Sequence, residues 1–154
     1  IHVFKYAPQY ELIVRDYIEM LVNTPSDVFR VIERDMYKIL LEILEEKRVL
    51  GTVPSLEEKK GKDYLLAQIQ KIATPGEFLA KMKYDPHQRG DVLFLTGVGK
   101  VYPFMRSHKM LDSMQQVFSD VPIVMFYPGE FNGQSLSLFD KFHDGNYYRA
   151  FNLL

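Results

Sequence analysis

The segment Val92-Leu93-Phe94-Leu95-Thr96-Gly97-Val98-Gly99-Lys100 decides the fold class. Its first four residues form a continuous apolar run, which is typical of a strand covered on both faces in a parallel sheet. A second apolar run spans residues 121–127, and the spacing of apolar residues in 103–118 favours a helix that begins at Pro103. A strand, a helix and a strand in this order predict a right-handed βαβ unit.

The residues before this unit predict further strands and helices. Residues 2–6 and 28–32 have strand-like composition, and Asp35 and Thr74 are suited to cap the N-termini of helices. A helix is also expected in residues 9–22, where apolar residues recur at helical spacing. It is expected to bury the apolar side chains of Leu12, Ile13, Tyr17, Met20 and Leu21.

The C-terminal residues predict an edge hairpin. Residues 136–142 and 147–153 are each β-like, and the Asp144-Gly145 step between them suits a tight turn. The elements together predict one α/β domain of residues 1–154, with a mostly parallel sheet of about four to six strands flanked by helices. The chain starts as if in the middle of a strand, so we expect a natural N-terminal segment before it.

The composition narrows the function classes. The chain has 19 Lys and Arg residues and 20 Asp and Glu residues, for a net charge of -1. This charge does not indicate DNA binding, although a local patch of basic residues remains an alternative. The absence of cysteine excludes disulfides, thiolate metal ligands and cysteine nucleophiles, and favours a cytoplasmic location. No apolar run approaches the roughly 20 residues that span a bilayer. The four histidines lack the spacing of metal ligands, so no metal site is predicted. No other cofactor is predicted either.

The Gly97-Val98-Gly99-Lys100 loop occupies the position of a phosphate-binding loop, between a strand and a helix. It departs from the nucleotide pattern, because Val101 follows the lysine and Tyr102 stands where a third glycine belongs. A nucleotide-hydrolysing loop is therefore disfavoured. A structural glycine turn and a binding loop for an anion or a partner both stay open.

Basic residues follow this loop. Arg106 and Lys109 lie three residues apart, on one face of the expected helix, and with Lys100 and His108 they form a candidate site for an anion or a partner. The alternative is that they are solvated side chains. Glu130 follows the second apolar strand, so a hydrolase built on Glu130 and His108 is a further hypothesis.

Several aromatic residues are candidates for an interface. Tyr147, Tyr148 and Arg149 form a cluster of residue types that are frequent at interface anchors and at sites of base stacking. Core packing is the alternative for at least one face of this segment. The remaining candidates for interface contacts, next to the two strand ends, are Tyr102, Tyr127 and Glu130.

Three segments resemble the BrxB family of BREX bacteriophage-exclusion systems, long described as a domain of unknown function. They are residues 92–108, the segment Val124-Met125-Phe126-Tyr127-Pro128-Gly129-Glu130, and the segment Asn146-Tyr147-Tyr148-Arg149-Ala150-Phe151. The family has no accepted enzymatic activity, so the resemblance assigns no catalytic residues.

The resemblance implies a non-catalytic component of an anti-phage defence complex. Such a component would contact other BREX subunits, namely an AAA-type ATPase and an alkaline-phosphatase-like protein. The alternative function is a nucleotide- or nucleic-acid-binding protein that uses the loop from Gly97 to Lys100.

Overall fold

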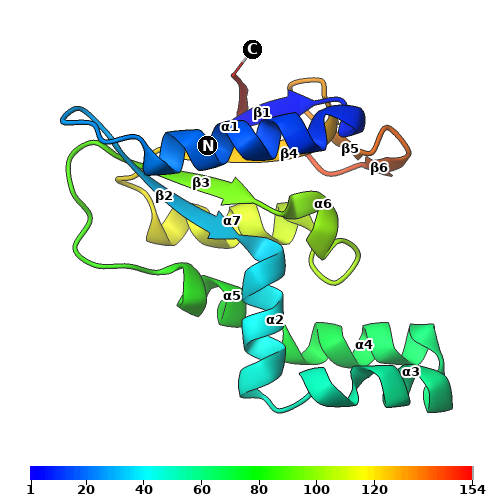
Figure 1. Cartoon of the computed structure of the whole chain (residues 1–154). Coiled ribbons are helices and arrows are strands. Elements are labelled where there is room, and N and C mark those ends of the chain that lie inside the picture. The colour runs from blue at the N-terminus through cyan, green and yellow to red at the C-terminus, as the bar shows by residue number, and fades with distance from the viewer. Residues whose placement is uncertain (154) are drawn as a thin grey trace.

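The computed structural model describes residues 1–153 and has an α/β architecture around a mostly parallel sheet (Figure 1). Five parallel strands lie in the order β2-β3-β4-β1-β7, which agrees with the expected sheet. Their bounds are His2–Tyr6 for β1, Arg30–Asp35 for β2, Asp91–Thr96 for β3, Ile123–Phe131 for β4 and Phe151–Asn152 for β7.

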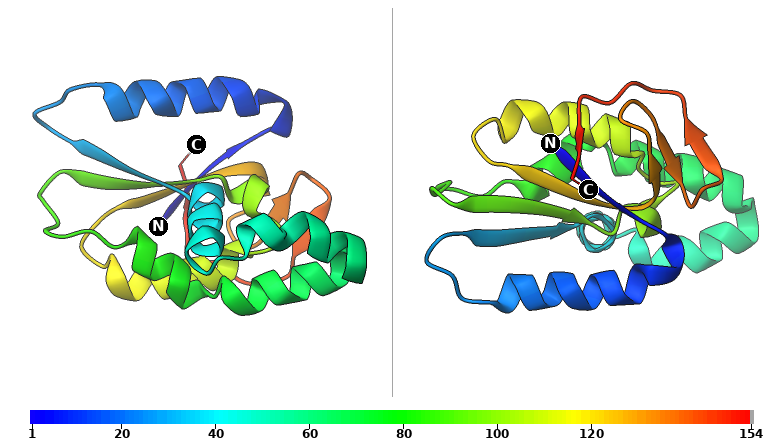
Figure 2. Two further views of the ribbon diagram at one scale, coloured as in Figure 1. Left: turned by 60° about the horizontal axis from the view of Figure 1, so that its bottom comes forward. Right: turned by 90° about the horizontal axis from the view of Figure 1, so that it is seen from above.

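The helices are divided unequally between the two faces of the sheet (Figure 2). Helix α1 lies alone on one face, and the other long helices cover the opposite face. The α-helices are α1 (Glu11–Asn23), α2 (Met36–Glu46), α3 (Val53–Lys60), α4 (Lys62–Ile72), α5 (Pro75–Met82), α6 (Val98–Val101) and α7 (Ser107–Val117), with short 3-10 turns at Pro8–Tyr10 and Leu50–Thr52.

The larger core lies between the sheet and α2, α4, α5 and α7. Alternate residues of β3, Leu93 and Leu95, point into it and are completely buried. Phe78 of α5 and Met110 of α7 are equally inaccessible to solvent. Each such side chain contributes about 1.5–3 kcal/mol through burial, so this face supplies most of the hydrophobic stabilisation.

The smaller core lies under α1. Val14 and Ile18 of α1 pack against Phe94, Val124 and Phe126 of the sheet. The expected inner stripe of this helix is therefore wrong for four of its five members, because only Leu21 packs partly against this core. The exposed members are Leu12 at 70%, Ile13 at 67%, and Tyr17 and Met20 at 51% each. The helix has apolar residues on two sides, and helical spacing alone does not tell which side faces the sheet.

The expected helix caps are confirmed. Asp35 Oδ1 accepts hydrogen bonds from the backbone N–H groups of Tyr37 (2.9 Å) and Lys38 (3.2 Å) at the start of α2. Thr74 Oγ1 accepts one from Glu77 N (3.3 Å) at the start of α5, where Pro75 is the first helical residue. A cap of this kind stabilises a helix by about 1 kcal/mol.

Helix α7 begins four residues later than expected. The residues around Pro103 instead close the end of α6, since Phe104 N and Met105 N both donate to Val101 O. The first helical residue is Ser107, and Arg106 is its extended N-cap. Arg106 is thus placed before the helix and not on a helical face shared with Lys109.

The C-terminal hairpin is present but differs in detail from the expectation. Strand β4 continues through Glu130 and pairs with β5 (Leu136–Leu138), which pairs with β6 (Phe142–Asp144). The turn is at Phe139 and Asp140, whose φ angles of 52° and 57° are typical of a tight hairpin turn. The prediction of a turn at Asp144-Gly145 is therefore wrong, and β7 pairs in parallel with β1 instead of joining the hairpin.

Candidate functional site at the carboxyl edge of the sheet

Two cavities open at the edge where the parallel strands end. Loops that leave parallel strands meet at this edge, which is where ligands bind in α/β sheets. The first cavity, of about 360 Å³, includes Asp35, Gly97 and Lys100 in its lining, and we call it the Gly97 cavity. The second, of about 450 Å³, includes Tyr102, Arg106 and Tyr127, and we call it the Tyr127 cavity.

Packing accounts for both glycines of the Gly97–Lys100 loop. Gly97 has a φ of +70°, and a Cβ on it would lie 2.3 Å from Asp35 Oδ1, the atom that caps α2. A Cβ on Gly99 would lie 2.8 Å from Pro128 Cγ and 2.9 Å from Phe139 Cζ. These neighbours leave no room for a side chain at either position, so packing requires glycine at both. This agrees with the structural glycine turn, one of the two interpretations of the sequence.

The Gly97 cavity has both acidic and basic residues in its lining. The acidic ones are Glu11, Asp16, Glu19, Glu33 and Asp35, and the basic ones are Arg15, Lys38 and Lys100. Lys100 is exposed there, and the loop continues into α6, a helix of only four residues. Inside the cavity, Thr96 Oγ1 donates a hydrogen bond to Glu33 Oε1 (2.8 Å), and Tyr6 donates one to Glu11 (2.5 Å). Burial, followed by this bond to Glu11, raises the pKa of the Tyr6 hydroxyl well above its usual value. The polar groups at the base of this cavity therefore bind one another.

The Tyr127 cavity lies between the start of α7, the end of β4 and the β5–β6 hairpin. Tyr127 is 2% exposed, and burial raises the pKa of its hydroxyl, with a further contribution from the carboxylate of Asp144. Tyr102 and Phe142 form one aromatic wall, with ring centroids 5.1 Å apart. The exposed cations Arg106 and Lys141 line the same space.

Asp144 is the centre of a hydrogen-bond cluster beside this cavity. It faces His108 Nδ1 at 3.1 Å, and it accepts hydrogen bonds from the Asn146 backbone N–H (3.1 Å) and from the Tyr148 hydroxyl. Burial acts to raise the pKa of Asp144, but the hydrogen bonds from Tyr148, Asn146 and His108 outweigh it and lower the pKa. The carboxylate is therefore held in its charged form by its neighbours.

The structure brings together some of the residues singled out from the sequence and separates others. Tyr102, Arg106 and Tyr127 line one cavity, and His108 and Tyr148 meet at Asp144 beside it. Gly97 and Lys100 line the other cavity, and Gly99 packs against Pro128 and Phe139. Four residues have exposed positions outside both linings: Lys109, Glu130, Tyr147 and Arg149.

Glu130 forms an ion pair with Lys5 (2.5 Å) across two neighbouring strands, and it lines neither cavity. Neither Glu130 nor His108 lines either of the two cavities described for residues 1–153, so neither cavity is the shared pocket that the hydrolase hypothesis requires. Asp144 is the residue that sequence reasoning missed. It was interpreted as part of a turn, and no pattern relates it to His108, which is 36 residues away.

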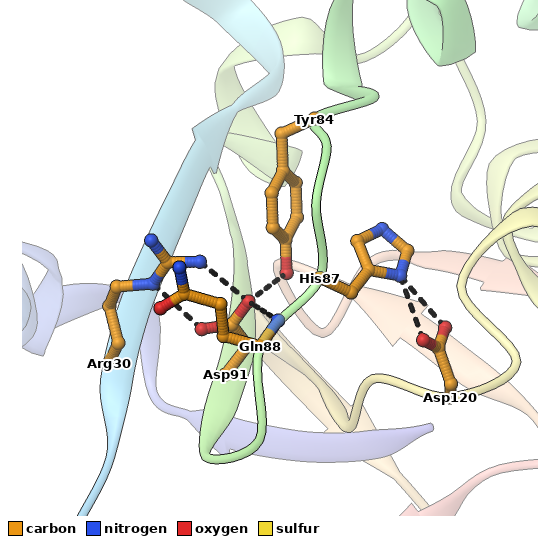
Figure 3. A network of polar contacts seen from close by, with 6 residues as sticks. All are labelled: Arg30, Tyr84, His87, Gln88, Asp91 and Asp120. Carbon is orange, nitrogen blue, oxygen red and sulfur yellow. Dashed lines mark hydrogen bonds and ion pairs between the residues drawn. The ribbon is translucent and has the colours of Figure 1, made fainter.

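A second polar cluster lies at the opposite, amino-terminal edge of the sheet (Figure 3). Asp91, 3% exposed, accepts two hydrogen bonds from the Arg30 guanidinium, 2.7 and 2.8 Å long. It also accepts hydrogen bonds from the Tyr84 hydroxyl (3.1 Å) and the Gln88 backbone N–H (2.8 Å). His87 packs on Tyr84 and faces Asp120, so the cluster fastens the loop before β3 to β2 and to the turn between α7 and β4.

Residues 1–153 contain neither a metal-binding cluster nor a membrane-spanning helix. Within this range no group of three or more His, Cys, Asp or Glu side chains is arranged to hold a metal ion. Within the same range no helix combines the length and the apolar character required to cross a bilayer.

Comparison with known proteins identifies the family. Residues 32–153 match the family model described as BREX protein BrxB. A BREX protein BrxB of Bacillus cereus (strain H3081.97) is 41% identical over 160 aligned positions, covering 99% of this chain and 82% of the relative. A BREX protein BrxB of Escherichia coli O9:H4 (strain HS) is 32% identical over 158 positions, covering 99% and 76%. No solved structure matches the chain significantly. The chain therefore belongs to the BrxB family of BREX proteins.

Proposed function

We propose that this chain is a non-catalytic assembly subunit of a BREX anti-phage defence system, which acts by contacts with the ATPase and phosphatase-like subunits of that system. The single observation that carries the proposal is the apolar outer surface of α1. This surface, the α1 surface, consists of Leu12, Ile13, Tyr17 and Met20.

The α1 surface differs from isolated apolar residues on an ordinary protein surface. Its four members project from one side of one helix, and each is at least half exposed. Tyr10, at 49% exposure, adjoins the start of the same helix. Contiguous apolar groups of this kind mark contact sites in soluble proteins, and Tyr and Met are enriched in the cores of such contacts.

The partner that fits this surface is a folded protein with an apolar groove. Ile13, Tyr17 and Met20 stand at positions i, i+4 and i+7 of α1, which is the spacing of the anchor residues when an amphipathic helix binds in such a groove. The opposite side of α1 is held on the sheet by Val14 and Ile18, so binding does not require the helix to leave the fold.

The double substitution Leu12→Glu/Tyr17→Glu tests the proposal. Both side chains are exposed, so the variant is expected to keep the wild-type circular dichroism spectrum and melting temperature. Burying two new carboxylates at an interface is expected to reduce capture of the partner subunits by at least about tenfold. The measurement is co-purification of the tagged chain with the ATPase and the phosphatase-like subunit, co-expressed from one operon.

The matched control is Gln115→Glu/Gln116→Glu, which adds the same charge at two exposed positions of α7. It is expected to retain wild-type capture. If the α1 variant and the control capture the partners equally well, the α1 surface is not the contact site. If the wild-type chain captures neither subunit, the assembly function itself is wrong.

A further inference from the structure

The Tyr127 cavity is lined by a tyrosine hydroxyl that has no hydrogen-bond partner within residues 1–153. Tyr127 is 98% buried, since its exposed fraction is 2%, and it lines the cavity. Within residues 1–153 no hydrogen bond or ion pair involves its hydroxyl. The hydroxyl oxygen is not among the side-chain atoms sealed from solvent without a partner, so it is accessible from the cavity and available to donate to a ligand there.

Donors and positive charge gather around the same cavity. Arg106 and Lys141 line it, and neither side chain has an ion-pair partner in the described part of the chain. Ser107, also in the lining, is the first residue of α7, an eleven-residue helix whose N-terminus has no side-chain cap. The free N–H groups of a helix N-terminus favour an anion, and both cations add to that preference.

One acidic residue, Asp144, lines the cavity, and neighbouring donors occupy its carboxylate oxygens. Its carboxylate accepts hydrogen bonds from Tyr148 and Asn146 and faces His108, as described above. The pKa of Tyr127 is raised, so its hydroxyl keeps its proton and acts as a donor. The remaining titratable residues in the lining are Tyr102, which is half-buried, and His143, which is exposed.

We propose that the Tyr127 cavity binds the phosphate group of a small phosphorylated molecule, with Arg106, Lys141 and the N-terminus of α7 around the phosphate and the Tyr127 hydroxyl donating to it. A phosphate monoester has a charge of about −1.5 to −2 and three acceptor oxygens, so it can accept from both cations, the N-terminus of α7 and the Tyr127 hydroxyl at once, whereas a carboxylate has two oxygens. The cavity volume of about 450 Å³ lies in the range of small-molecule sites, and the wall formed by Tyr102 and Phe142 suits an organic group attached to the phosphate.

Calorimetric titration of the purified chain with three probes tests this site. The probes are inorganic phosphate, adenosine 5′-monophosphate and adenosine. Binding of the first two, with no measurable binding of adenosine, supports the proposal. Equal affinity for phosphate and for the monophosphate also supports the proposal. It would mean that the aromatic wall contributes nothing to the binding free energy. Absence of binding by both phosphate probes, or equal affinity for adenosine and its monophosphate, overturns it.

Substitutions locate the site. Arg106→Ala and Tyr127→Phe are each expected to weaken phosphate binding by about tenfold or more, the loss typical of a hydrogen bond between a protein group and a charged partner. Lys100→Ala and Lys109→Ala are the controls, since both remove an exposed cation outside this cavity, and wild-type affinity is expected for each. Loss of binding in Lys100→Ala alone would place the anion at the Gly97–Lys100 loop and overturn the proposal.

Tyr127→Phe separates binding from folding. Because no residue bonds to the hydroxyl, its removal leaves no donor or acceptor without a partner, and the melting temperature without phosphate is expected to stay at the wild-type value or rise slightly. Wild-type affinity in both Arg106→Ala and Tyr127→Phe would show that the phosphate binds elsewhere. This test needs no partner subunit, so its result is independent of the proposed assembly function.

Discussion

Replacing Asp91 with alanine is expected to lower the free energy of unfolding by about 2–3 kcal/mol, because several donors then lose their only carboxylate. The side chain is 3% exposed and accepts two hydrogen bonds from Arg30, one from Tyr84 and one from the Gln88 backbone. The Tyr84 hydroxyl and the Gln88 N–H are partly buried and find no equivalent acceptor nearby. Urea denaturation at neutral pH measures the loss.

Asp120→Ala is the matched control. It removes a carboxylate from the same edge of the sheet, where the side chain is 61% exposed and faces only His87. An exposed pair contributes little, so stability is expected to remain within about 1 kcal/mol of the wild type. Equal losses in the two variants would contradict a special role for the buried carboxylate.

The same carboxylate predicts a dependence of stability on acid. Hydrogen bonds from Arg30, followed by those from Gln88 and Tyr84, hold the pKa of Asp91 well below its usual range, despite its burial. Its stabilisation is therefore fully present above the unfolded-state pKa of about 3.9 and declines as the pH falls below it. The stability difference between wild type and Asp91→Ala is expected to be constant from about pH 7 to 5 and to shrink below about pH 4. Urea midpoints across this range test it, and a difference that grows in acid would contradict it.

Gly97→Ala is the second substitution with a large expected effect, a loss of about 2–4 kcal/mol in the free energy of unfolding. The new methyl group would lie 2.3 Å from Asp35 Oδ1, and the backbone would hold alanine at a φ of +70°. The strained backbone and the displaced cap of α2 both contribute. The expected result is a lower urea midpoint with reduced helical ellipticity.

Gly51→Ala is the control for this substitution. A Cβ at Gly51 meets nothing within 4 Å, and its φ is not in the left-handed region. Alanine there is expected to leave stability unchanged or to raise it slightly, because it restricts the unfolded chain. Wild-type stability in Gly97→Ala would mean that the loop relaxes and that packing does not account for its glycines.

The parallel sheet could be predicted from sequence because its strands have strong local signals. Continuous apolar runs mark β3 and most of β4, and both strands are covered on both faces. The capping side chains Asp35 and Thr74 likewise act within three residues of their own positions. Signals of this kind depend only on neighbours in the chain.

The features that could not be predicted depend on contacts between distant segments. The orientation of α1 depends on which of its two apolar sides fits Phe94, Val124 and Phe126. The start of α7 depends on the turn that follows α6, which removed Pro103 from the helix. In the Tyr127 cavity, Asp144 reaches His108 only because the hairpin folds back beside α7.

Because the five strands run in the same direction, the sheet has one edge where they start and one edge where they end. Every strand starts at the edge where Arg30 and Asp91 tie the sheet together, and ends at the edge where both cavities open. The linings of the two cavities combine strand residues with residues of helices and of the loops that follow the strands. The contacts that stabilise the sheet and the two cavities thus lie at opposite edges. Substitutions in a cavity are therefore expected to leave the contacts between Arg30 and Asp91 unchanged.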